Sequence, residues 1–174
     1  EEIDYKSYEA QMQKLIDRHV GSDEVRQLTK LVDIFDSEFE AEVERIEGNA
    51  SRADAIASRT KKTIQERMDE DPAFYKRLSY LLRQIIDEYR SARMKAAADF
   101  LEREKADAEY LQRVKDLKSE VLSHGLESVP SSLREHSSSL AFYHTLMSEL
   151  PERLTDNKDA MAELALQIDD TVKN

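Results

Sequence analysis

The stretch from Asp71 to Arg90, DPAFYKRLSYLLRQIIDEYR, decides the fold class. It opens with Asp71 and Pro72, a strong helix start, because aspartate can accept hydrogen bonds from the first free amides and proline there gives up no needed donor. Apolar residues then recur every three or four positions, at Phe74, Leu78, Leu81, Leu82, Ile85 and Tyr89. This spacing predicts an amphipathic α-helix with one buried face.

Apolar residues keep the same spacing along most of the chain, so we expect a string of helices. The expected helices cover about residues 5–19, 25–28, 37–47, 51–68, 72–95, 100–124, 133–150 and 161–172. The expected helix ends are Gly21, Gly48, Gly125 and Pro151, since these residue types stop helices. Asp36, Ser51 and a capping box of Ser132 with Glu135 are expected to begin helices. We expect a buried connection at residues 31–36 and a turn at residues 95–98.

The composition favours an all-α protein. The 174 residues include only 3 glycines and 3 prolines, too few for the frequent turns of a β-sandwich or barrel. There is no cysteine, which excludes disulfides, thiolate metal sites and a cysteine nucleophile. No apolar run approaches the roughly 18 residues of a membrane span. We therefore expect an irregular multi-helix bundle of about 6–8 helices in two packed subdomains.

We expect the two subdomains to divide near residue 96. Residues 1–95 would form one helical domain and residues 96–174 a C-terminal helical region. The second region contains the best loop candidate, near residues 125–139, which holds Pro130 and several serines. The chain begins with Glu1 rather than methionine, so we expect it to be a segment of a longer chain.

No catalytic, cofactor-binding or metal-ligating residues are predicted. The three glycines are isolated, so no glycine-rich loop can cradle a phosphate. Glu120 and His124 are four residues apart, but one such pair is expected by chance among 37 acidic residues. His136 and His144 lie on the apolar stripe of one expected helix, which favours core or interface histidines over metal ligands.

The net charge of −11 hides a basic segment. Residues 51–95 hold 11 basic and 7 acidic residues, a net charge of +4, whereas the rest holds 15 basic and 30 acidic, a net charge of −15. Candidate contacts to a DNA backbone are Arg52, Arg59, Lys61, Lys62, Arg67, Arg83 and Arg90. The competing interpretation is a solvated helix face with ordinary ion pairs.

The segment from Arg52 to Tyr75, RADAIASRTKKTIQERMDEDPAFY, closely resembles the helical region of the motor (restriction) subunit of type I restriction-modification enzymes. Residues 31–35, 81–90 and 162–169 are similar to flanking segments of that family. Residues 105–150 show little similarity to it.

The resemblance implies a non-catalytic part of a bacterial, cytoplasmic subunit that translocates DNA with ATP and Mg²⁺ and cleaves it. This segment would hold no cofactor itself. It would dock on the methyltransferase subunit complex and contact DNA backbone weakly and non-specifically, with no membrane involved. Two alternatives remain: a stand-alone helical scaffold or interaction domain, and a metal-carboxylate enzyme built on a helical bundle.

Overall fold

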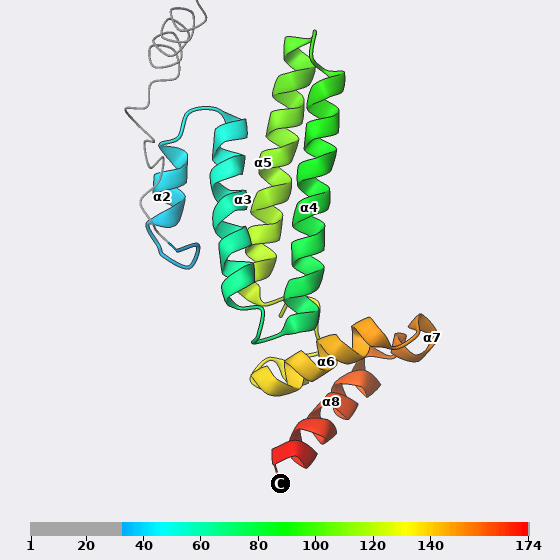
Figure 1. The fold of residues 1–174 in the computed structure, drawn as a ribbon. Coiled ribbons are helices and arrows are strands. Elements are labelled where there is room, and N and C mark those ends of the chain that lie inside the picture. Colours follow the sequence, from blue (N-terminus) through cyan, green and yellow to red (C-terminus); the bar gives the residue numbers. More distant parts are fainter. Residues whose placement is uncertain (1–32, 174) are drawn as a thin grey trace, which may run out of the picture. The chain divides into compact units, whose positions relative to one another are not determined.

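The computed structural model describes residues 33–173, and this part is all helical, as predicted (Figure 1). The elements are α2 (Phe39–Glu44), α3 (Asn49–Glu66), α4 (Pro72–Lys95), α5 (Phe100–Ser123), the 3-10 helix η1 (Ser131–Leu133), α6 (Ser137–Glu149), α7 (Glu152–Thr155) and α8 (Lys158–Lys173). The helices predicted at residues 5–19 and 25–28 lie outside the described residues. No helix in the described part is both long and apolar enough to cross a bilayer.

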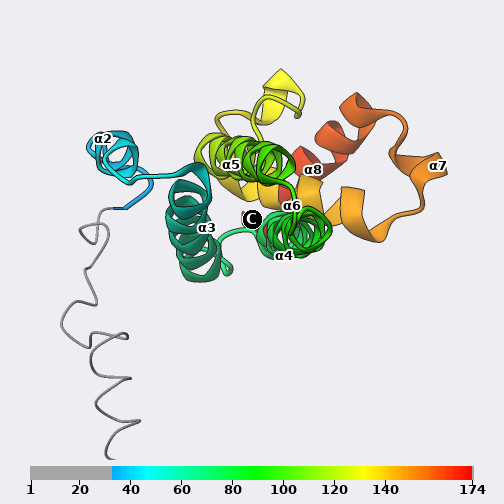
Figure 2. The same cartoon turned by 90° about the horizontal axis from the view of Figure 1, so that it is seen from above.

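Helices α3, α4 and α5 form a three-helix bundle, seen nearly end-on in Figure 2, with α2 packed on α3. Their shared core contains large side chains that are almost wholly buried. These include Phe39, Val43, Ile56, Ile64, Phe74, Tyr75, Leu78, Leu82, Ile85, Tyr110, Val114, Leu117 and Val121. The predicted apolar face of residues 71–90 is therefore the centre of the fold.

The α4–α5 hairpin is longer than the helix beside it. Helices α4 and α5 each have 24 residues, whereas α3 has 18, so the hairpin extends past the start of α3 (Figure 1). The turn at its tip lies between Lys95 and Phe100, as predicted, and Asp99 caps α5 by accepting from the amides of Leu101 (2.9 Å) and Glu102 (3.3 Å). The tip consequently lacks the cover that α3 gives the rest of the hairpin.

Helices α6 and α8 pack together around a second, smaller core at the opposite end of the hairpin (Figure 1). Its buried residues are Val129, Leu133, Leu140, Tyr143, Ala162 and Ala165. A buried hydrogen bond from the Ser139 hydroxyl to the Asp169 carboxylate (2.8 Å) joins the two helices. The predicted division near residue 96 falls between α4 and α5, whose side chains share the first core.

Two predicted helix starts are wrong. Helix α3 begins at Asn49, two residues before Ser51, because Gly48 adopts a positive φ of 82° and turns the chain into the helix at once. No capping box starts α6, which begins at Ser137 without a side-chain cap. Residues 131–133 instead form the 3-10 turn that buries Leu133 completely.

The predicted cap at Asp36 is also wrong, because a short turn separates Asp36 from the start of α2. The Asp36 carboxylate accepts from the amide of Glu38 (2.9 Å), in the turn that precedes α2. Helix α2 itself begins at Phe39 and has no side-chain cap.

Candidate functional site

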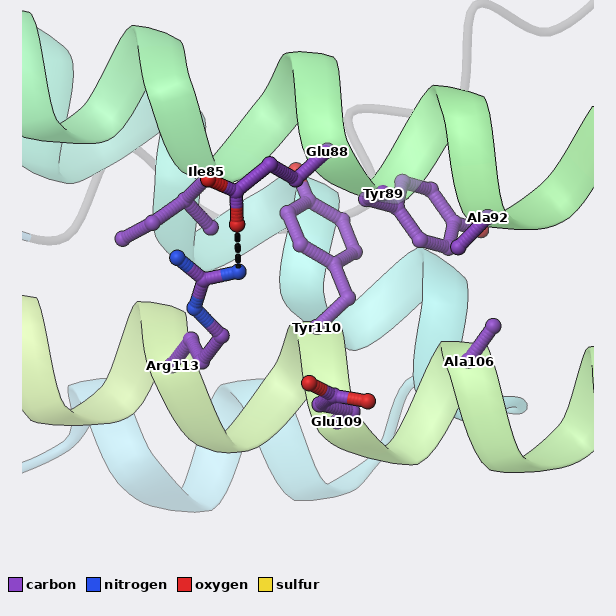
Figure 3. Close-up of a pocket in the computed structure, with 8 residues that line it drawn as sticks. All are labelled: Ile85, Glu88, Tyr89, Ala92, Ala106, Glu109, Tyr110 and Arg113. Atoms are coloured by element: carbon purple, nitrogen blue, oxygen red, sulfur yellow. Dashed lines mark hydrogen bonds and ion pairs between the residues drawn. The ribbon is translucent and has the colours of Figure 1, made fainter.

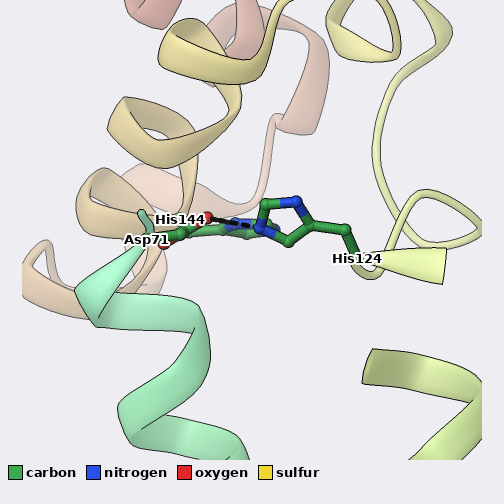
Figure 4. Close-up of side chains that lie close together, drawn as sticks. All are labelled: Asp71, His124 and His144. Atoms are coloured by element: carbon green, nitrogen blue, oxygen red, sulfur yellow. Dashed lines mark hydrogen bonds and ion pairs between the residues drawn. The ribbon is translucent and has the colours of Figure 1, made fainter. Parts of the chain in front are cut away.

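The base of the α4–α5 hairpin holds a buried carboxylate between two imidazoles (Figure 4). Asp71 caps α4, because its Oδ1 accepts from the amide of Phe74 (3.1 Å). Its other oxygen, Oδ2, lies 2.6 Å from Nδ1 of His144 and 3.3 Å from Nε2 of His124. The start of α4, the end of α5 and the middle of α6 therefore meet at one oxygen atom.

The backbone at the end of α5 directs His124 toward this carboxylate. His124 takes the left-handed conformation (φ 50°), and Gly125 follows with φ 67°. A Cβ at position 125 would lie 2.8 Å from Cε2 of Phe74, so only glycine allows the phenylalanine ring this close. The predicted helix stop at Gly125 thus also sets the distance between α5 and α4.

Aromatic packing holds both imidazoles in place. The Phe74 ring stacks on His144 (centroids 5.0 Å apart, 22° between planes) and lies 4.8 Å from the His124 ring. Tyr75 stacks on the other imidazole, at 5.5 Å from His124. The two histidine side chains are mostly buried, and Asp71 is 0 % exposed. These contacts fix the orientations of the two imidazole rings.

Asp71 stays ionised in this environment. Burial would raise its pKa, but the hydrogen bonds of His124 and His144, the charge of His144 and the amide of Phe74 outweigh burial and lower the pKa to about 2. A buried anion with two imidazole partners can tie three helices together or can bind a cation. Within the described residues, this is the one group of three metal-ligand side chains that lie within 4.8 Å of one another.

Sequence reasoning did not find this group. The pairing considered there, Glu120 with His124, is not made, because the Glu120 carboxylate pairs with Arg77 (2.5 Å). The partner of both histidines is Asp71, which lies 53 residues from His124 and 73 from His144. Only the tertiary fold brings these positions together.

The predicted basic face divides into two groups. Lys61, Arg83 and Arg90 line one groove of about 190 Å³ between α3 and α4. Asp87 also lines the groove and lies 3.8 Å from Arg90, so the lining keeps an excess of positive charge. Lys61 and Arg83 form no ion pair within residues 33–173. We call this surface the basic groove.

The other four candidates do not line the groove. Arg52 donates to the carbonyls of Ile46 (2.7 Å) and Glu44 (3.1 Å), which ties α3 to the end of α2. Lys62 pairs with Glu66 (3.6 Å). Arg67 pairs with Glu70 (3.7 Å) and lies over the Phe35 ring (4.3 Å). Arg59 is half-buried on α3 and also has an interaction partner.

A hollow of about 140 Å³ between α4 and α5 is closed by interactions within the protein (Figure 3). The Tyr89 and Tyr110 rings stack in it with centroids 4.0 Å apart. Burial raises the pKa of Tyr110, and its hydroxyl donates to Asp54 (3.1 Å). An ion pair between Arg113 and Glu88 crosses the hollow. Because these side chains already contact one another, we interpret the hollow as part of the packing between α4 and α5 and not as a ligand site.

The hairpin tip exposes large apolar side chains. Met94 is 79 % exposed, Phe100 65 % and Leu101 76 %. Met94 lies near the end of α4, and Phe100 and Leu101 begin α5, so all three belong to the end of the hairpin that extends past the start of α3 (Figure 1). We call these three residues the apolar tip.

Comparison with protein-family models, curated proteins and solved structures found no match to this chain. The described part of the chain offers three candidate binding features: the apolar tip, the basic groove and the buried Asp71 carboxylate with its two histidines.

Proposed function

We propose that this chain is a non-catalytic helical binding module of a type I restriction motor subunit, and that it attaches the motor to the methyltransferase complex. The observation that carries the proposal is the apolar tip of the α4–α5 hairpin. Large apolar side chains left exposed at the same end of the hairpin favour an interaction site there. The resemblance of residues 52–75 to the motor subunit supplies the partner. In this proposal ATP and Mg²⁺ act elsewhere in the parent subunit, in the bacterial cytoplasm.

The tip is well built for docking because its backbone is braced just below the exposed side chains. Arg93 of α4 donates to both oxygens of Asp107 on α5 (3.0 and 3.1 Å). The Tyr89 hydroxyl donates to the same carboxylate (2.9 Å). A rigid surface loses little conformational entropy on binding. Each apolar side chain of the tip could contribute about 1.5–3 kcal/mol if a partner buried it fully.

Binding of the whole chain to the purified methyltransferase complex tests the proposal by gel filtration and calorimetry. We expect co-elution, and we expect Phe100→Glu with Leu101→Glu to weaken binding at least about tenfold, because a charge must then be desolvated in the interface. The matched control is Tyr80→Glu, since Tyr80 is 70 % exposed on the same hairpin but lies away from the tip. Absence of co-elution at tens of micromolar, or equal loss in the control, contradicts the proposal.

A second candidate function, contact with DNA backbone, is favoured by the basic groove. Lys61, Arg83 and Arg90 come from two helices yet line one surface depression. Phosphate binding by lysine and arginine releases counterions, so affinity falls steeply with salt. The acidic remainder of the chain opposes binding, and the expected affinity of the isolated chain is therefore low.

Substitution of Lys61→Glu with Arg83→Glu tests DNA binding. Affinity for duplex DNA of any sequence should fall, and the slope of log affinity against log salt should shrink by about 2, one phosphate per lost cation. Lys62→Glu with Arg67→Glu is the matched control, because both cations already pair with nearby glutamates. Salt-independent binding, or an equal loss of affinity in the control variant, would contradict DNA contact through the basic groove.

The two alternatives make different predictions. A stand-alone scaffold would bind neither the methyltransferase complex nor DNA through these surfaces. A metal-carboxylate enzyme would show metal-dependent hydrolysis by the purified chain.

A further inference from the structure

The buried group of Asp71, His124 and His144 has the donor atoms of a transition-metal site. Two imidazole nitrogens and one carboxylate oxygen lie within 4.8 Å of one another. This donor set suits zinc and its neighbours in the periodic table, whereas Mg²⁺ and Ca²⁺ prefer oxygen ligands alone. Zinc binds imidazole nitrogen at about 2.0–2.1 Å and carboxylate oxygen at about 2.0–2.2 Å.

The two nitrogen-to-oxygen separations can be compared with those around a bound ion, and all three donor atoms lie within 4.8 Å of one another. Ligands at about 2.0–2.1 Å in tetrahedral geometry are separated by roughly 3.3 Å. Nε2 of His124 is already 3.3 Å from Oδ2 of Asp71. Nδ1 of His144, at 2.6 Å from the same oxygen, would have to retreat by about 0.7 Å, which a small side-chain rotation provides.

The surroundings hold the three ligands in place without competing for the ion. The amide of Phe74 fixes the second carboxylate oxygen, and the rings of Phe74 and Tyr75 pack against the imidazoles. Such supporting contacts orient ligands and raise metal affinity. Within residues 33–173, no lysine or arginine contacts the Asp71 carboxylate, so only the two imidazoles would exchange their contact with it for a shared ion.

We propose that Asp71, His124 and His144 bind one zinc-class divalent ion, which fastens α6 to the start of α4 and the end of α5. Three protein ligands leave a fourth position for water. The ion would join the three-helix bundle to the second core, at the point where Asp71 already links α5 and α6. This inference does not depend on the proposed docking or DNA functions.

The test is titration of the purified whole chain, stripped of metal by a chelator, with Zn²⁺ in a calorimeter and with Co²⁺ in an absorption spectrometer. We expect one ion per chain and visible cobalt bands typical of nitrogen and oxygen ligands. We also expect a melting temperature that rises with zinc concentration, because the ion binds the folded state. Affinity should fall as pH falls, since protons compete for the imidazoles.

The key variants are Asp71→Asn and His144→Gln. Asparagine keeps a capping oxygen for Phe74, so the first variant should stay folded while losing the charged ligand. Each variant should lower zinc affinity at least about 100-fold, more than the loss of a supporting contact would. Circular dichroism of each variant verifies the helical fold.

The matched controls are Glu120→Gln and His136→Gln. Glu120 lies one helical turn from His124 but pairs with Arg77, and His136 is an exposed histidine at the start of α6. Both control variants should bind zinc as the original chain does. The proposal is overturned if the original chain binds no equimolar ion, if Asp71→Asn binds as tightly, or if the controls lose as much affinity as His144→Gln.

Discussion

The two ends of the α4–α5 hairpin are built from the same pair of helices but differ in what covers them. At the base, Phe74 is 1 % exposed, and its ring contacts the imidazoles of two other elements. At the tip, Phe100 is 65 % exposed and no other helix of the described part covers it. The same kind of side chain is thus core at one end and surface at the other.

The two ends of the hairpin also differ in how much they contribute to the stability of the fold. The base combines burial, ring stacking and a shared carboxylate, all of which are lost on unfolding. The tip has an N-cap and the Arg93–Asp107 brace, so its apolar side chains contribute little to folding. We infer that the base keeps the hairpin folded and that the tip is available to a partner.

The largest expected difference in stability is between two single variants, each of which replaces a phenylalanine with alanine at one end of the hairpin. Phe74→Ala should lower the free energy of unfolding by about 3–5 kcal/mol, because it leaves a cavity among buried rings. Phe100→Ala should change it by no more than about 0.5 kcal/mol. Urea denaturation of both variants measures the two values. Similar losses at both ends would mean that the tip is part of the core.

The pH dependence of the free energy of unfolding tests how much the Asp71 carboxylate stabilises the base of the hairpin. The pKa of Asp71 is lowered from 3.8 to about 2 on folding, so its contribution is complete above about pH 4 and disappears as pH falls through 2. The expected loss is on the order of 2 kcal/mol. Asp71→Asn keeps the cap but cannot titrate.

Denaturant unfolding at a series of pH values checks this prediction. The stability difference between the original chain and Asp71→Asn should shrink as pH falls from about 4 to about 2. A difference that does not change down to pH 2 would show that the carboxylate gains nothing from its histidine partners.

The two aspartate caps, Asp99 at the tip and Asp71 at the base, also allow a direct comparison of the two ends. Asp99→Ala removes the acceptor for the amides of Leu101 and Glu102 and should cost about 1 kcal/mol. Asp71→Ala, the equivalent change at the base, should cost more because it also leaves both imidazoles without their acceptor. Thermal unfolding of the two variants ranks them, and the reverse order would contradict the comparison.

Local signals in the sequence predicted much of the fold. Asp71 with Pro72 does begin α4, and the turn near residue 96 does separate α4 from α5. The predicted cap at Ser51 rests on residue type, and the predicted cap at Ser132 on its spacing to Glu135. In the structure, the positive φ of Gly48 sets the start of α3, and the burial of Leu133 in a 3-10 turn moves the start of α6 to Ser137. Residue type alone determines neither the backbone angle nor the packing.

The candidate sites were harder to predict, because they depend on which helix faces which. The spacing of residues along α3 and along α4 does not show which side chains of the two helices lie together. In the structure, Lys61, Arg83 and Arg90 line one groove, whereas Arg52 contacts the end of α2. An apolar residue such as Phe100 looks the same in sequence whether or not a neighbouring helix covers it.

Photo-cross-linking at the apolar tip tests the central claim most directly. Phe100 would be replaced by the photoreactive analogue p-benzoylphenylalanine, and in a second variant Tyr80 would be replaced in the same way; each is illuminated with the methyltransferase complex. The account predicts a specific cross-linked product from position 100 and little from position 80. Equal yields at both positions, or a product from position 80 alone, would contradict docking through the tip.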